Sequence, residues 1–186
     1  MKKTIIDGVS YHPHSNGGGL VAETATVSKT TYIGPDAKVH DKAKISGNAS
    51  VHGTAEIFGN VAVFDDAEVC GKAKVFDDAK VWGRTKVFGN ARVSGNAEVC
   101  GKAKVSGNAM VFDNAIVTDK AKIYGYAEVW GNAKVHDQAK ISGNALVHGT
   151  AEISGTAEVS GYADVTFKIN GSQIYTDNDG QTKPSK

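Results

Sequence analysis

The sequence predicts an all-β fold, a parallel β-solenoid built from six-residue units. Three regularities support this prediction. An aliphatic residue, Val or Ile, recurs at every sixth position from Val21 to Val165 without an insertion. A small residue, nearly always Ala, stands two positions before it, and Gly or Asp stands two positions after it almost throughout.

Each Ala-x-Val unit is typical of a short β-strand, because residues two apart in a strand point to the same face. A helix cannot hold this pattern, since a six-residue period drifts around 3.6 residues per turn and leaves no fixed apolar stripe. Gly, Asp and Asn tolerate left-handed backbone conformations and predict a corner after each strand. Strands this short cannot bury a core alone, so we expect stacked coils about 4.8 Å apart.

Three segments follow from the extent of this pattern. Residues 1–20 precede it and are expected to form an N-terminal capping segment, because a solenoid end exposes unpaired strand edges. Residues 21–165 form the repeat itself, about eight coils. Residues 166–186 are expected to form a C-terminal hairpin cap and a disordered tail, since apolar residues alternate around Asn170-Gly171 and polar residues follow Thr176.

Composition restricts the partners and the compartment. The 186 residues include 21 Lys+Arg and 20 Asp+Glu, a net charge of +1, so no global field favours nucleic acid or a membrane surface. The chain has no apolar run of about 18 residues and no signal-peptide run at its start, which predicts a cytoplasmic protein. Cys70 and Cys100 occupy identical "EVCGKAKV" contexts, which indicates repeated structural thiols rather than a disulfide or a catalytic pair.

The repeat resembles the hexapeptide-repeat left-handed β-helix proteins. "IGPDAK" at Ile33 has their aliphatic, Gly, two variable and small residues in order, whereas the other units carry Ser, His, Phe, Cys or Trp where the family often has Gly. The "[VI]-x-[GD]-[NKT]-A-x" variant is similar to YdcK-type proteins of bacteria and phages, which are usually labelled transferases although their activity is unknown. The resemblance covers residues 21–165 and implies three units in each triangular coil, so that positions 18 residues apart stack in columns.

One predicted outward column is rich in aromatic rings. It contains His40, Phe58, Phe76, Ser94, Phe112, Trp130 and His148. Large apolar side chains on a solvated face indicate a contact surface, although such rings also support neighbouring coils of a rod. We therefore expect a homo-oligomer, with the trimer that is common in the resembling family favoured, or a protein partner. The expected interface residues are Phe58, Phe76, Met110, Phe112, Trp130 and Leu146.

A second column carries one lysine per coil, bounded by Glu68 and Glu158. Its members are Lys86, Lys104, Lys122 and Lys140. Such a row is typical of a solvated face that deters edge pairing, and its alternative function is an anion-binding stripe.

Histidines are the residues that an enzyme of the resembling family would use. Acyl transfer there resembles general-base catalysis by a histidine beside a pantetheine arm. The candidates here are His12, His14, His40 and His148. Residues 37–60 and 133–156 match at twenty of twenty-four positions, so repeat duplication explains the internal histidines better than catalysis does. His12 and His14 flank Pro13, but two ligands do not complete a metal site, and no metal is predicted.

The leading hypothesis is therefore a non-catalytic, oligomeric β-solenoid that acts as a binding or scaffold protein and needs no cofactor. If the gene is phage-borne, inhibition of a host protein is one form that this binding would take. The alternative is a hexapeptide-type acyltransferase that uses acetyl-CoA or another acyl-CoA. An enzyme needs a walled pocket, whereas a binding protein needs only an exposed stripe.

Overall fold

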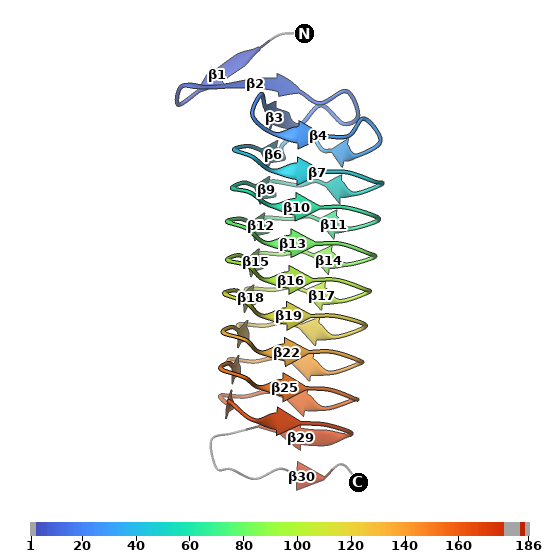
Figure 1. Cartoon of the computed structure of the whole chain (residues 1–186), viewed down its shortest axis with the longest axis vertical. Coiled ribbons are helices and arrows are strands. Elements are labelled where there is room, and N and C mark those ends of the chain that lie inside the picture. The colour runs from blue at the N-terminus through green and yellow to red at the C-terminus, as the bar shows by residue number, and fades with distance from the viewer. Residues whose placement is uncertain (1–2, 177–182, 185–186) are drawn as a thin grey trace.

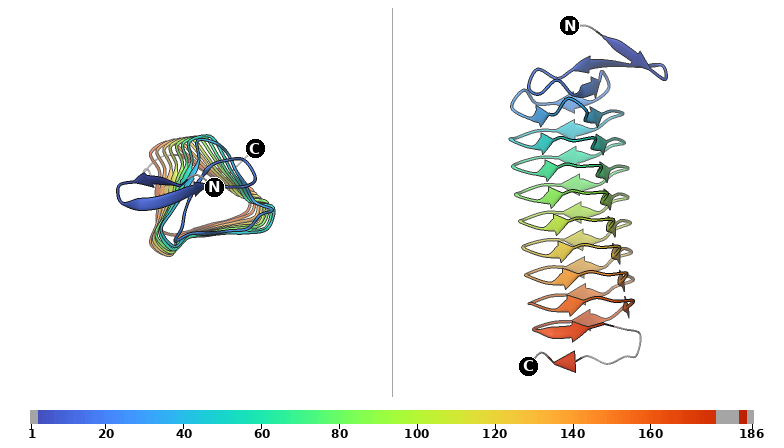
Figure 2. Two further views of the ribbon diagram at one scale, coloured as in Figure 1. Left: turned by 90° about the horizontal axis from the view of Figure 1, so that it is seen from above. Right: turned by 180° about the vertical axis from the view of Figure 1, so that it is seen from behind.

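The computed structural model describes residues 3–176 and 183–184. These residues form a tall column with a triangular cross-section (Figures 1 and 2). The described chain is all-β and contains no helix, so no helix in it is long and apolar enough to cross a membrane. The predicted parallel β-solenoid is confirmed.

Three sheets form the sides of the column, and we name them face A, face B and face C. Face A has 11 strands, which begin with an antiparallel ribbon and continue as parallel strands. Its strands are β1 (Thr4–Ile6), β2 (Val9–Pro13), β3 (Leu20–Ala22), β6 (Lys38–Val39), β9 (Glu56–Ile57), β12 (Lys74–Val75), β15 (Arg92–Val93), β18 (Met110–Val111), β21 (Glu128–Val129), β24 (Leu146–Val147) and β27 (Asp164–Val165).

Faces B and C are built in the same way from the other two strands of each coil. Face B has nine strands: β4 (Thr26–Val27), β7 (Lys44–Ile45), β10 (Ala62–Val63), β13 (Lys80–Val81), β16 (Glu98–Val99), β19 (Ile116–Val117), β22 (Lys134–Val135), β25 (Glu152–Ile153) and β28 (Lys168–Ile169). Face C has ten: β5 (Tyr32–Ile33), β8 (Ser50–Val51), β11 (Glu68–Val69), β14 (Lys86–Val87), β17 (Lys104–Val105), β20 (Lys122–Ile123), β23 (Lys140–Ile141), β26 (Glu158–Val159), β29 (Gln173–Tyr175) and β30 (Lys183–Pro184).

The coil is left-handed. In Figure 1, strands β7, β10 and β13 cross the front from left to right while the chain descends from its N-terminal end. A chain that moves this way around its axis while it advances describes a left-handed screw. The handedness implied by the family resemblance therefore agrees with the structure.

The core is a stack of small aliphatic residues. The Val or Ile of each repeat unit and the Ala two positions before it point inward, and nearly all of them are fully buried. Two threonines replace Ala at this inward position. The hydroxyl of Thr85 donates a 2.7 Å hydrogen bond to the carbonyl of Trp82, whereas the buried hydroxyl of Thr31 has no hydrogen-bond partner among the described residues.

The corner conformation explains why either Gly or Asp occupies the position two residues after nearly every Val or Ile of the repeat. Both residue types adopt positive φ there, for example Gly95 at 64° and Asp77 at 61°. Gly does so without steric cost, while Asp has a compensating contact, because its carboxylate accepts a hydrogen bond from the backbone N–H one coil further on. Six corner aspartates make this bond, at 2.8 to 3.3 Å: Asp41, Asp65, Asp77, Asp113, Asp119 and Asp137.

The N-terminal end of the column is covered by the ribbon of β1 and β2. Strand β2 pairs antiparallel with β3, the first parallel strand of face A, and so protects the edge of that sheet. Tyr11 of this ribbon is buried, with an exposed fraction of 6%. Its ring meets the His40 ring edge-on at 6.4 Å between centroids.

The C-terminal end differs from the expected hairpin. Strands β28 and β29 do not pair with each other around Asn170-Gly171, but extend faces B and C in parallel and complete a ninth coil. Ile169 follows Val165 after four residues instead of six, so the six-residue period ends before the coil does. Strand β29 then pairs antiparallel with β30. Of the predicted disordered tail, residues 177–182 and 185–186 lie outside the described residues.

Candidate functional site

Face A carries the predicted aromatic column as two stacks of parallel rings. In the first stack, His40, Phe58 and Phe76 follow one another with centroids 5.1 Å apart. In the second, Phe112 lies 5.6 Å from Trp130, and Trp130 lies 4.3 Å from His148. Each ring covers part of the next, so the aromatic side chains are half-buried within one chain rather than fully exposed.

The two stacks are separated at Ser94. This small side chain occupies the position of one missing ring between Phe76 and Phe112. A depression of about 240 Å³ opens there, lined by Phe76, Arg92, Ser94, Met110 and Phe112. The Arg92 guanidinium lies 5.8 Å from the centroid of Phe76, in cation–π range. The ladder is therefore interrupted near its middle by an apolar gap with one cationic wall.

A second outward column runs beside the aromatic one, and its charge changes sign along the rod. Its N-terminal half contains three basic residues and one acidic residue: Lys38, Glu56, Lys74 and Arg92. Its C-terminal half contains two apolar and two acidic residues: Met110, Glu128, Leu146 and Asp164. Within the basic half, Lys74 donates to Glu56 at 2.6 Å, and this hydrogen bond lowers the pKa of the Glu56 carboxyl.

Face C carries the predicted lysine column in register across four neighbouring strands. The two end members are neutralised, since Lys86 donates to Glu68 at 2.5 Å and Lys140 to Glu158 at 2.6 Å. Lys104 and Lys122 make no ion pair with any other described residue. The row therefore has two uncompensated ammonium groups at its centre.

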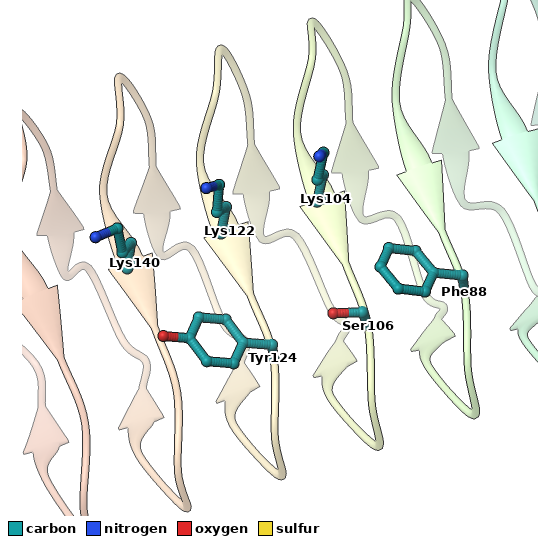
Figure 3. Close-up of a pocket in the computed structure, with 6 residues that line it drawn as sticks. All are labelled: Phe88, Lys104, Ser106, Lys122, Tyr124 and Lys140. Carbon is teal, nitrogen blue, oxygen red and sulfur yellow. The ribbon is translucent and has the colours of Figure 1, made fainter.

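Beside these lysines lies a depression of about 350 Å³, and Figure 3 shows six residues that line it. Phe88, Ser106 and Tyr124 form one row of the picture, and Lys104, Lys122 and Lys140 form the other. The rings of Phe88 and Tyr124 are 37% and 41% exposed, more than any ring of the face A ladder. Face C thus combines open ring surfaces with positive charge.

The four internal histidines each face a carboxylate. His148 lies 2.7 Å from Asp164, and His40 lies 3.2 Å from Asp41. His52 contacts Glu68 at 3.4 Å on face C, and His136 contacts Glu152 at 3.3 Å on face B. The candidates His40 and His148 stand at opposite ends of the face A ladder, and the structure does not bring them together.

His12 and His14 lie in the N-terminal cap. The His14 ring is buried, and its Nδ1 lies 3.1 Å from the carbonyl of Asn16 and 3.3 Å from the backbone N–H of the same residue. The His12 ring is half-buried, and its Nδ1 lies 3.4 Å from the Pro13 carbonyl. The His14 contacts hold the loop that leads into β3, whereas the His12 contact lies within β2.

Comparison with known proteins gives one match at the level of families. Residues 103–119 match the family model described as the YdcK beta solenoid repeat. The match covers one part of the rod, from β17 to the corner after β19. No curated protein matches. Among solved structures, a chain from "Activity and Crystal Structure of Arabidopsis UDP-N-acetylglucosamine acyltransferase" is 13% identical, with 87% of this chain and 73% of that chain covered and a TM-score of 0.45.

The residues matched by the YdcK repeat model include Lys104 and Ser106 of the face C depression. Phe88, Ser106 and Tyr124 were not predicted as site residues. The signal for them was present in the sequence, because an aromatic, a serine and an aromatic follow at intervals of 18 residues, as they do at Phe76, Ser94 and Phe112. What the interval does not show is that the rings of Phe88 and Tyr124 are exposed, whereas those of Phe76 and Phe112 are half-buried.

One mixed cluster of side chains on face C has the residue types of a metal site. Ligand atoms of His52, Glu68 and Cys70 all lie within 4.8 Å of one another. Glu68, however, is already bound by the Lys86 ammonium, whose positive charge opposes a cation at the same carboxylate. Burial and the neighbouring Glu68 carboxylate also raise the pKa of the Cys70 thiol, which keeps it protonated. These contacts favour a structural ion pair at this position.

Proposed function

We propose that this protein is a non-catalytic binding rod that joins a second copy of itself through face A. The observation that supports the proposal is the gap at Ser94, an aromatic-walled depression near the middle of an otherwise continuous ladder. A gap of one ring in an apolar face leaves ring surfaces of Phe76 and Phe112 in water. A ring supplied by another copy would fill it.

A twofold axis placed between the coils of β15 and β18 brings the required ring to this position. If this axis runs along the strand direction, the two rods lie antiparallel. The eight face A strands from β6 to β27 of one copy then face the same eight strands of the other copy in reverse order, so that β15 lies opposite β18 and β6 opposite β27. Ser94 of each copy then meets Phe112 of the other, so that both gaps are filled. This is an isologous contact, in which one surface patch serves both copies.

The charged column of face A matches this arrangement. The same axis places Lys38 opposite Asp164 of the second copy, and Lys74 opposite Glu128. Glu56 and Arg92 meet Leu146 and Met110, so no acidic side chain opposes an acidic one. A parallel trimer, which the sequence favoured, would bring side chains from the same height of the rod together and set the basic half beside the basic half. The charges therefore favour the antiparallel pair over the trimer.

The interface is expected to be weak to moderate. Eight strands at about 4.8 Å spacing give a strip roughly 38 Å long, and two outward side chains per strand give a width of about 12 Å. The two copies would together bury about 900 Å², which is below the standard size of stable protein interfaces. We therefore expect association that depends on protein concentration.

Sedimentation velocity across a wide range of protein concentration tests the proposal. The unmodified protein should pass from one copy to two as its concentration rises. Ser94→Phe completes the ladder within the chain and fills the gap that Phe112 of the second copy would occupy. This variant should therefore remain a single copy. Ser142→Phe, an equivalent change on face C, is the matched control and should assemble like the unmodified protein.

The direction of the two rods has its own measurement. A zero-length carbodiimide cross-link between Lys38 and Asp164 would require two antiparallel copies, because these residues lie at opposite ends of one rod. A single copy at all concentrations would overturn self-assembly, and a trimer without this cross-link would overturn the antiparallel pair. The acyltransferase alternative has no specific support in the described residues, where the internal histidines lie against carboxylates on three separate faces.

A further inference from the structure

We infer that the depression on face C is a binding site for a small planar aromatic anion, of which a nucleoside monophosphate is the chemical type. The inference goes beyond the proposed assembly and uses none of its residues. It rests on the two uncompensated lysines, Lys104 and Lys122, and on the open rings of Phe88 and Tyr124 in the same depression.

The lysines supply an anion site of limited size. Lys104 and Lys122 occupy paired positions on neighbouring strands, which are spaced by about 4.8 Å. Two ammonium groups at this spacing can bind oxygens of a single phosphate, and hydrogen bonds between charged groups are the stronger kind. Glu68 and Glu158 neutralise Lys86 and Lys140 at the two ends of the row. The uncompensated positive charge is thus confined to Lys104 and Lys122, a stretch that one phosphate group can span.

The rings supply a stacking surface beside that anion site. Lys122 and Tyr124 flank Ile123 on one strand and both point outward, so they lie about 7 Å apart along the strand. This distance is comparable to the separation of base and 5′-phosphate across the sugar of a nucleotide. Figure 3 shows Ser106 between the two rings, with its hydroxyl in the same row. A base can stack on either ring while its phosphate reaches the lysines.

A nucleic acid strand fits the same surface less well. Single-stranded nucleic acids are bound along extended grooves with continuous positive charge and several stacking rings. Here the carboxylates of Glu68 and Glu158 close the row, and the whole chain has a net charge of only +1. We therefore commit to a free nucleotide as the ligand and treat the polymer as an outcome of the test.

Isothermal titration at low salt with adenosine monophosphate, adenosine and inorganic phosphate is the test. We expect adenosine monophosphate to bind with a Kd on the order of 1 mM or tighter, and each of its halves to bind about tenfold more weakly. Lys104→Gln with Lys122→Gln should weaken adenosine monophosphate about tenfold and leave adenosine unchanged. The matched control is Lys44→Gln with Lys134→Gln, two exposed lysines of face B, which should change neither affinity.

The aromatic half of the site has a separate variant. Tyr124→Ser with Phe88→Ser should lower the affinity for adenosine monophosphate to that for inorganic phosphate. Saturation-transfer NMR should show the base protons close to the protein in the unmodified chain and not in this variant. Circular dichroism and the thermal midpoint check that each surface variant is folded.

Several results would overturn the inference. These are absence of binding at about 10 mM nucleotide, equal affinity for nucleotide and phosphate, or undiminished binding after loss of both lysines. Much tighter binding of a single-stranded oligonucleotide than of the mononucleotide would show that the site binds a nucleic acid polymer and not a free nucleotide. The Ser94→Phe variant should bind the nucleotide normally, so failure of the assembly proposal and failure of this one are distinguishable.

Discussion

The carboxylate of Asp77 accepts a 3.1 Å hydrogen bond from the backbone N–H of Gly95, at the same corner one coil further along the rod. Asp77 has a φ of 61°, a conformation that costs most residues about 1 to 2 kcal/mol. The bond between the coils compensates for this cost. It also adds a side-chain contact between successive corners, which are joined as well by the 3.0 Å bond from the Asp78 backbone N–H to the Gly95 carbonyl.

Substitution of Asp77 separates these two effects. Asp77→Ala should lower the free energy of unfolding by about 1 to 2 kcal/mol, because it loses the bond and keeps the unfavourable φ. Asp77→Gly should lie close to the unmodified protein, since Gly adopts this φ at no steric cost. Chemical denaturation midpoints measure the difference. Equal midpoints for the two variants would show that the corner conformation does not matter.

Acid should destabilise the rod through its carboxylates. The backbone N–H of Gly155 lowers the pKa of Asp137, and hydrogen bonds from Lys74 and Lys86 lower the pKa values of Glu56 and Glu68. A carboxyl whose pKa is lower in the folded state binds its proton more readily when unfolded, so stability is lost as pH falls.

The expected pH window follows from the ordinary pKa values of these groups, 3.8 for Asp and 4.5 for Glu. The thermal midpoint should be constant from neutral pH to about pH 5 and should fall below it. Glu56→Gln with Glu68→Gln should reduce this fall at the lowest pH values. A midpoint that rises on acidification would contradict the assignment.

The two buried threonines provide a matched pair. Thr31→Val removes a buried hydroxyl that has no hydrogen-bond partner among the described residues, and should raise stability by about 1 kcal/mol. Thr85→Val removes a hydroxyl bonded to the Trp82 carbonyl, and should lower stability by a similar amount. Val is already tolerated at this inward position, as Val61 shows. Denaturation midpoints that shift in the same direction would contradict the pairing.

Packing of the interior can be tested at Ala103, which is fully buried. Ala103→Leu should lower stability by about 1 to 3 kcal/mol, because three additional carbon atoms must fit between coils already in contact. Lys102→Leu, at the exposed corner next to it, adds a similar side chain to solvent and should have little effect. Urea midpoints of the two variants and the unmodified protein give the comparison.

The sequence predicted the interior because each position of the repeat has one environment. Val105 and Ala103 are inward for the same reason as every other Val and Ala of the repeat, so one periodicity defines the whole core. The ninth coil was missed because Ile169 and Tyr175 reach faces B and C through a shortened corner. Strand pairing tolerates the loss of two corner residues, whereas a search for a fixed six-residue period does not.

The surface sites were less predictable, because the 18-residue spacing shows which side chains stack in a column but not how each side chain is oriented. Phe76 and Phe112 were recognised, but the depression at Ser94 depends on which way the neighbouring rings lean. Phe88 and Tyr124 belong to a similar column, yet their rings stay exposed because Cys70, Ser106 and Ser142 provide no ring on either side of them, whereas Phe76 stacks on Phe58 and Phe112 on Trp130. The paired ends of the lysine row likewise depend on side-chain conformations that periodicity does not specify.

The duplicated stretches 37–60 and 133–156 show what uniform corners allow over evolutionary time. The same "VHD" tripeptide places His40 on face A and His136 on face B, while the interior around both remains unchanged. Recombination between six-residue units therefore moves a set of surface side chains around the rod without a penalty to folding. A gene of this kind can present its existing side chains to new partners by copying its own segments, and single substitutions, such as the four that distinguish these stretches, then adjust each copy.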